Sequence, residues 1–242
     1  MFINFPFDHL IIDNFFEHEL AEKLSEQFPD YEEDLWYAHD NVTEVKKLVN
    51  NWNRFPPETY KTFVYLNSLE FIEKVKKLTG IKTLYADNGL HGGGWHIHKN
   101  GGKLNIHQDY SIHPKLGLQR KLNLIVYMTK DWNYDYGGEL ELWSDKDGQP
   151  FKKEKSITPL FNRAVLFDTT QNSWHGLPEE MNLPKGIFRK SIAVYYLTDP
   201  PEGVNQRKRA LFTPTEKQKG NKEVEEFIKK RAEWKKGKLF FK

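Results

Sequence analysis

The chain has 242 residues and a formal net charge of +2, with 38% hydrophobic and 14% aromatic residues and no cysteine. This length and composition predict one folded domain with a sizeable core and argue against wholesale disorder. The lack of cysteine excludes a disulfide framework, a thiolate metal site and a cysteine nucleophile. A net charge so close to zero gives no general attraction to nucleic acid or to an anionic membrane.

The N-terminal sequence MFINFPFDHLIIDNFF has neither the basic start nor the small-residue cleavage site of a signal peptide. No apolar run in the sequence is long enough to span a bilayer. We therefore expect no membrane segment and a cytoplasmic location.

The first part of the chain, about residues 1–80, is predicted to be helical. EHELAEKLSEQF carries leucines and phenylalanine at helical spacing, and a proline follows it. Residues 31–60 read as irregular. The stretch TYKTFVYLNSLEFIEKVKKLTG then predicts a second helical region that ends at Gly80, a natural C-cap.

A strand-rich core is predicted from about residue 81 to 199. RKLNLIVYMT, GGELELWS, NRAVLFDTT and FRKSIAVYYLT are short, rich in β-branched and aromatic residues, and separated by Gly, Asn, Asp and Pro. This pattern favours an antiparallel sandwich or barrel, so the fold class is mainly β with flanking α-helices.

The sheet is predicted to end at Asp199-Pro200-Pro201, and a helical extension follows over about residues 200–242. KEVEEFIKKRAEWKKG reads as a charged helix there. The basic runs QRKR and IKKRAEWKKGKLFFK are interpreted as solvated surface, and contact with nucleic acid or an acidic partner is the less favoured alternative.

A candidate metal site begins in NIHQDYSIHP, which places His107 and Asp109 two residues apart in a predicted strand. Side chains two apart share a strand face, so an imidazole and a carboxylate can reach one ion. The pair alone is weak evidence, because such spacings arise by chance. A third ligand is available in His175, which follows the apolar strand AVLFD, and two histidines with one carboxylate form the facial triad of non-haem Fe(II) oxygenases.

A candidate anion site lies in GIFRKSIAVYY, where Arg189 and Ser191 alternate onto one strand face. A guanidinium can bind a carboxylate through two hydrogen bonds, and the serine hydroxyl can add another. An arginine that reaches water from a strand end is the alternative. The ligands upstream favour the anion role.

The order of these motifs, H-x-D, RKLNLIVYMTKDW, YGGELELW, a distal histidine and R-K-S, resembles the 2-oxoglutarate- and Fe(II)-dependent dioxygenases, and within them the prolyl-hydroxylase branch. The resemblance covers roughly residues 80–200. It implies a double-stranded β-helix, or jelly-roll, core in a single domain. It implies Fe(II) as cofactor and 2-oxoglutarate as cosubstrate, with ascorbate as a further reductant.

The resemblance also assigns roles to individual residues. His107, Asp109 and His175 would bind iron, and Arg189 with Tyr127 would bind the distal carboxylate of 2-oxoglutarate. Asn123 shares the Tyr127 face of its strand, and Leu140 falls where the family packs an apolar residue beside the cosubstrate. The distal histidine and the anion-binding residue stand farther apart than in the collagen-type enzymes, and that residue is Arg instead of Lys, which puts the substrate class in doubt.

The expected function is hydroxylation of a prolyl residue in a peptide or protein, with release of succinate and CO2. Free proline or another small amino acid is an alternative substrate. A non-catalytic cupin-like module that binds metal or sugar is a rival, and an oxygenase of nucleic-acid bases is disfavoured by the low net charge. The roles of His91, His96, His98 and His113 stay open, as does the oligomeric state.

Overall fold

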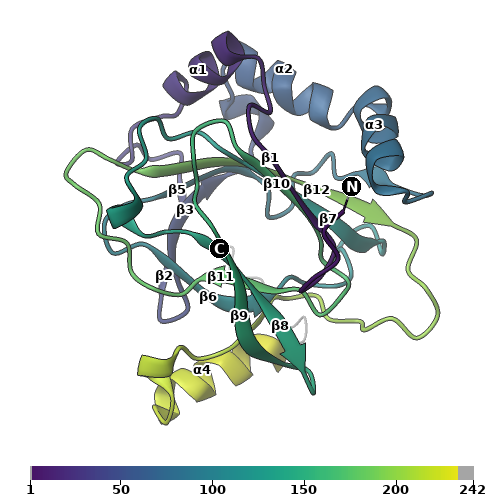
Figure 1. The fold of residues 1–242 in the computed structure, drawn as a ribbon, viewed down its shortest axis with the longest axis vertical. Coiled ribbons are helices and arrows are strands. Elements are labelled where there is room, and N and C mark those ends of the chain that lie inside the picture. The colour runs from purple at the N-terminus through teal and green to yellow at the C-terminus, as the bar shows by residue number, and fades with distance from the viewer. Residues whose placement is uncertain (1, 234–242) are drawn as a thin grey trace, which may run out of the picture.

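The centre of the fold is an antiparallel sheet with 13 strands in residues 2–233, the part of the chain that this computed structural model describes. The sheet curls into two facing layers (Figure 1). One interior cluster shows the closure, because it joins Tyr127 and Phe167 from one layer to Leu140 and Ile157 from strands far along the sheet. This arrangement confirms the predicted jelly-roll core.

The strands follow one another across the sheet in an order unlike that of the sequence. That order is β1 (His9–Ile12), β10 (Ala164–Asp168), β7 (Gln119–Tyr127), β12 (Arg189–Thr198), β5 (Gly94–His98), β3 (Glu44–Val49), β6 (Lys103–Gln108), β11 (Trp174–Leu177), β8 (Leu140–Lys146) and β9 (Gln149–Ile157). Three strands branch from it: β2 (Tyr37–Asn41) pairs with β3, β4 (Tyr85–Ala86) with β12, and β13 (Leu211–Phe212) with β6.

Helices cover the molecule on two sides (Figure 1). The helices α1 (His18–Glu26), α2 (Pro57–Leu66) and α3 (Leu69–Thr79) lie together on one side, and α4 (Lys222–Glu233) lies on the opposite side. The largest apolar core forms between the first three helices and the outer face of β7, β12 and β5. The sheet therefore has an apolar outer face under the helices and an interior face that is free to carry polar side chains.

The predicted helices and strands are largely confirmed. The first helix forms as α1, and the four predicted core strands form as β7, β8, β10 and β12. The second helical region is two helices, because the Ser68 hydroxyl caps the new helix α3 by accepting from the Phe71 amide. Gly80 ends α3 in the left-handed conformation, at a φ of 75°.

Two predictions about which residues join the sheet are wrong. Residues 31–60 are not irregular, because β2 and β3 form a hairpin that joins the sheet. Alternation in β3 puts Val49 in the core under the helices and turns Glu44 and Lys46 to the opposite face, so that face begins with two charged residues. The sheet also continues beyond Asp199, since β13 pairs with β6. The predicted C-terminal helix is described to Glu233, and its remainder lies outside the described residues.

Candidate metal centre

The two predicted histidine ligands lie side by side on neighbouring strands. His107 of β6 is directly opposite His175 of β11 in the strand register, and Asp109 follows the end of β6. One ligand atom from each of the three lies within 4.8 Å of the others, and all three side chains are buried. Among residues 2–233, this is the one group of three such side chains gathered around a point.

Backbone carbonyls orient both imidazoles. His107 Nδ1 is 2.9 Å from the Asn105 oxygen, and His175 Nδ1 is 2.8 Å from the Ser173 oxygen. A carbonyl only accepts, so Nδ1 carries the proton in each ring and Nε2 keeps its lone pair. Burial, reinforced by the neighbouring His175, lowers the pKa of His107 to about 3, and burial also lowers the pKa of His175. Both rings are therefore neutral, as metal ligands must be.

The carboxylate between them is charged and incompletely bonded. Burial alone would raise the pKa of Asp109, but the basic groups around it, led by the Arg120 guanidinium 3.2 Å from Oδ1, together hold the pKa below its usual value. Asp109 Oδ2 is buried with no hydrogen-bond partner and lies 4.0 Å from His175 Nε2. An unpartnered buried oxygen facing imidazole lone pairs fits a divalent cation.

The predicted anion site is buried as well. Arg189 is buried, its Nε donates to the Gly138 oxygen at 2.8 Å, and its guanidinium carbon lies 4.8 Å from the centre of the Tyr127 ring. The Tyr127 hydroxyl and both ring nitrogens of His98, which pairs with Arg189 across the sheet, have no hydrogen-bond partner. Buried donors without acceptors beside a cation fit a carboxylate group.

The other predicted site residues share this interior. Ser191 is buried and lies opposite Tyr127 in the strand register. Leu140 packs in the same interior cluster as Tyr127, and Asn123 is buried opposite Tyr195. The structure thus brings every residue predicted for iron or cosubstrate onto the interior face of the sheet.

Sequence reasoning missed Arg120, the side chain that touches the carboxylate ligand. Its guanidinium carbon lies 3.5 Å from the centre of the Tyr110 ring and 3.3 Å from that of Tyr195, so two aromatic faces enclose it. The signal was available, because an arginine at the start of the apolar strand RKLNLIVYMT needs an anionic partner when it is buried.

The remaining histidines divide into two groups. The rings of His91 and His113 meet edge to face near Asp87, and the His91 carbonyl accepts from Arg120. His96 bonds the Gly92 carbonyl through Nε2 at 3.1 Å. His98 differs from the other three, because it alone among them lies opposite Arg189 in the strand register.

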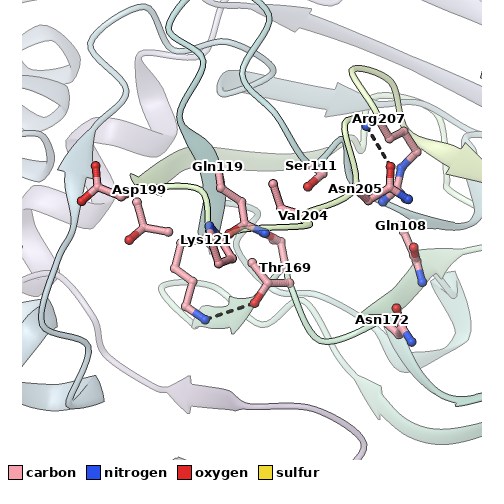
Figure 2. Close-up of a pocket in the computed structure, with 13 residues that line it drawn as sticks. Gln108, Ser111, Gln119, Lys121, Thr169, Asn172, Asp199, Val204, Asn205 and Arg207 are labelled. Atoms are coloured by element: carbon pink, nitrogen blue, oxygen red, sulfur yellow. Dashed lines mark hydrogen bonds between the residues drawn. The ribbon is translucent and has the colours of Figure 1, made fainter.

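A polar cleft of about 580 Å³ lies beside the ligand-bearing segments (Figure 2). Gln108 lines it and sits between two ligands in the sequence, so its side chain points to the face opposite theirs. The cleft is therefore separate from the metal centre. Its walls are mostly amide and hydroxyl groups, among them Ser111, Gln119, Thr169, Asn172 and Asn205.

Sequence comparison supports the class that this site defines. Residues 93–197 match the model of the 2OG-Fe(II) oxygenase superfamily. Prolyl 3-hydroxylase OGFOD1 of Xenopus laevis is 31% identical over 91 residues, which are 36% of this chain and 17% of that protein. The mouse protein is 32% identical over 87 residues, which cover 34% and 16%. The chain thus matches about a sixth of the length of these curated relatives.

Solved structures share the fold. A prolyl-4-hydroxylase of Pseudomonas putida has a TM-score of 0.56 at 12% identity, with 80% of this chain and 93% of that chain covered. A Trichoplax adhaerens prolyl hydroxylase in complex with a hypoxia inducible factor peptide has a TM-score of 0.56 at 17% identity, with 78% and 83% covered. HygX of Streptomyces hygroscopicus, solved with nickel, 2-oxoglutarate and hygromycin B, has 0.53 at 11% identity, with 82% and 85% covered.

The fold and the site together define a non-haem iron oxygenase. Residues 93–197 carry the match to the 2OG-Fe(II) oxygenase superfamily, whose cofactor is Fe(II) and whose cosubstrate is 2-oxoglutarate, and the relatives and solved structures that the chain resembles include prolyl hydroxylases. This confirms the resemblance found in the sequence. No helix within residues 2–233 is long and apolar enough to cross a membrane.

Proposed function

We propose that the protein hydroxylates a prolyl residue in a peptide or protein, consuming 2-oxoglutarate and O2 and releasing succinate and CO2. The observation that carries the proposal is the buried triad of His107, Asp109 and His175, whose ligand atoms converge within 4.8 Å, and the Arg189 and Tyr127 pair is buried as well. The prolyl substrate is supported by the similarity to prolyl 3-hydroxylase OGFOD1 and by the prolyl-hydroxylase fold.

The three ligands would hold the metal by one face and leave its other positions open for cosubstrate and oxygen. Fe(II) bound there supplies the activation of O2 that no side chain can perform. Asp109 stays ionised because the positive charge of Arg120 favours its carboxylate form, so the side chain offers an anionic oxygen to the cation. The fixed Nδ1 protons of the two histidines keep both Nε2 atoms directed at the same point.

Arg189 and Tyr127 would hold the distal carboxylate of 2-oxoglutarate. Burial raises the pKa of the Tyr127 phenol against the opposing effect of Arg189, so its hydroxyl keeps its proton and can donate. Because both side chains are fully buried, the carboxylate would exchange water for a guanidinium and a hydroxyl in a low-dielectric interior. This contact would orient the keto acid toward the triad.

An anaerobic titration with Fe(II) and then 2-oxoglutarate tests the reaction class. Wild type should develop the weak visible charge-transfer band of a keto acid chelated to Fe(II). Asp109→Ala should lose the band, and Arg189→Ala should need at least tenfold more 2-oxoglutarate. Arg163→Ala, which removes an arginine paired with the exposed Asp13, serves as the control and should titrate like wild type. No band in wild type at saturating ligand would overturn the proposal and favour a non-catalytic cupin-like module.

A second measurement addresses the substrate. Proline-containing peptides should raise the rate of succinate release above the rate measured without any substrate to hydroxylate. Free proline should leave that rate unchanged. Stimulation by free proline or another small amino acid, with none by peptides, would assign the enzyme to the alternative substrate class.

A further inference from the structure

The chain returns to the metal centre after β12. On the outer edge of β6, β3 pairs only with the start of the strand, near Leu104. The edge nearer the ligands is covered by β13, which places Phe212 opposite His107. We call residues 207–213 the C-terminal strap. Because an unpaired strand edge opens readily, the strap stabilises the half of β6 that carries the first ligand.

Hydrogen bonds to the backbone of this segment extend the contact past both ligands of the H-x-D pair. The Thr213 amide donates to the Ile106 oxygen at 2.9 Å, and the Arg207 guanidinium donates to the Asp109 backbone oxygen at 2.7 Å. The Ser111 amide donates to the Arg207 oxygen at 2.8 Å. The strap is thus bonded to the ligand-bearing segment before His107 and after Asp109.

The strap also reaches the residue that fixes the His107 tautomer. The Asn105 side-chain amide donates to the Thr213 oxygen at 3.0 Å and to Gln218 Oε1 at 2.6 Å. The Asn105 backbone oxygen in turn accepts from His107 Nδ1. Movement of the strap would therefore disturb the carbonyl that orients this imidazole.

A single side chain makes the most direct contact. The Phe212 ring is buried and stacks on the His107 imidazole, with centres 4.9 Å apart and planes inclined by 23°. The Arg231 guanidinium of α4 also lies over Phe212, and its central carbon is 4.6 Å from the centre of the phenyl ring. Arg231 forms an ion pair with the buried Glu44 of β3. The phenyl ring is thereby held between the metal ligand and the C-terminal helix.

We propose that the C-terminal strap is part of the metal centre and that Phe212 is a positioning residue for His107. The flat ring limits rotation of the imidazole and keeps its Nε2 directed toward Asp109. The inference rests on the proposed function, because it takes His107 as a ligand. Groups that orient a metal ligand from outside its coordination sphere usually contribute about 10–100-fold to metal affinity.

The test is a Co(II) titration followed by its visible absorption, without cosubstrate or substrate. Phe212→Ala should raise the dissociation constant for Co(II) about 10–100-fold and alter the band shape. Phe212→Tyr, which keeps the ring, should stay within about threefold of wild type. The control is Val224→Ala, which removes a buried side chain of α4 without touching His107 and should also stay within about threefold. If Phe212→Ala fails to fold, Phe212→Leu carries the test, with an expected loss above threefold.

The outcomes separate this inference from the function on which it rests. Cobalt binding that is lost in His107→Ala but unchanged in Phe212→Ala would overturn the role of Phe212 alone. An equal loss in Phe212→Ala and Val224→Ala would also overturn it, because the effect would then come from general loosening of the extension. Wild type that binds no cobalt, or His107→Ala that binds like wild type, would overturn both.

Discussion

The buried Arg120 is the side chain whose removal should reveal most about the metal centre. Its guanidinium lies 3.2 Å from Asp109 Oδ1 and is enclosed between the rings of Tyr110 and Tyr195. Arg120→Met would leave the Asp109 carboxylate charged and unpaired in the interior. Breaking a buried ion pair by removing one partner typically destabilises a protein by about 3–5 kcal/mol, so we expect a loss in that range.

The assay is urea unfolding at neutral pH in the presence of a chelator, so that no metal contributes. Arg163→Met is the matched control, because Arg163 pairs with Asp13, whose side chain is 58% exposed. An ion pair with an exposed partner contributes about 0–1 kcal/mol. The double variant Arg120→Met/Asp109→Asn removes the stranded charge and should be more stable than Arg120→Met alone.

Either of two results would refute this reasoning. Arg120→Met could lose no more stability than Arg163→Met, which would mean that water or rearrangement compensates the carboxylate. The double variant could also lose the sum of the two single losses, which would mean that Arg120 and Asp109 do not interact energetically.

Three further predictions follow from the interior and its backbone. Burial lowers the pKa of His96 to about 3, so below about pH 6.5 the unfolded chain binds a proton that the folded chain does not. The free energy of unfolding should therefore decrease as the pH is lowered. In urea unfolding between about pH 6 and 4, His96→Gln should remove a slope of about 1.4 kcal/mol per pH unit, and an unchanged slope in this variant would contradict the prediction. Tyr127→Phe should raise the 2-oxoglutarate needed for the charge-transfer band about tenfold or more, and an unchanged titration would contradict its contact with the cosubstrate. Gly94→Ala should destabilise the protein by several kcal/mol more than Gly101→Ala by thermal unfolding, because both have positive φ but only at Gly94 would a Cβ meet a backbone oxygen, at 2.0 Å. Equal losses would show that the strand moves to accommodate the methyl group.

The parts of the fold that could be predicted are those in which local pattern and tertiary role agree. In β7, Leu122, Leu124 and Val126 face the helices, while Asn123 and Tyr127 face the interior. Alternation alone gives this division, since the outer face must be apolar to bury the helices. The triad was predictable because its residue types are specific, although the register that sets His175 opposite His107 is a long-range property that no local pattern contains.

The parts that could not be predicted carry polar residues on buried faces. One face of β3 carries Glu44 and Lys46, so the sequence lacks the regular apolar alternation of a strand and resembles that of an exposed loop. The strand β13 contributes only Leu211 and Phe212, which is too short for a periodic signal. Both strands are specified by their partners in β5 and β6, and a partner far along the sequence leaves no local trace.

The same division explains why the interior can hold unpaired polar groups. Asp109 Oδ2, the Tyr127 hydroxyl and both His98 nitrogens are buried without partners, and each unsatisfied group destabilises the fold by about 1–3 kcal/mol. The helix-covered outer face offsets this loss, because it buries the large apolar cluster formed with the first three helices. Stability is therefore concentrated on one face of the sheet and binding capacity on the other, so a metal and a dicarboxylate that satisfy the interior groups would relieve the strain where it arises.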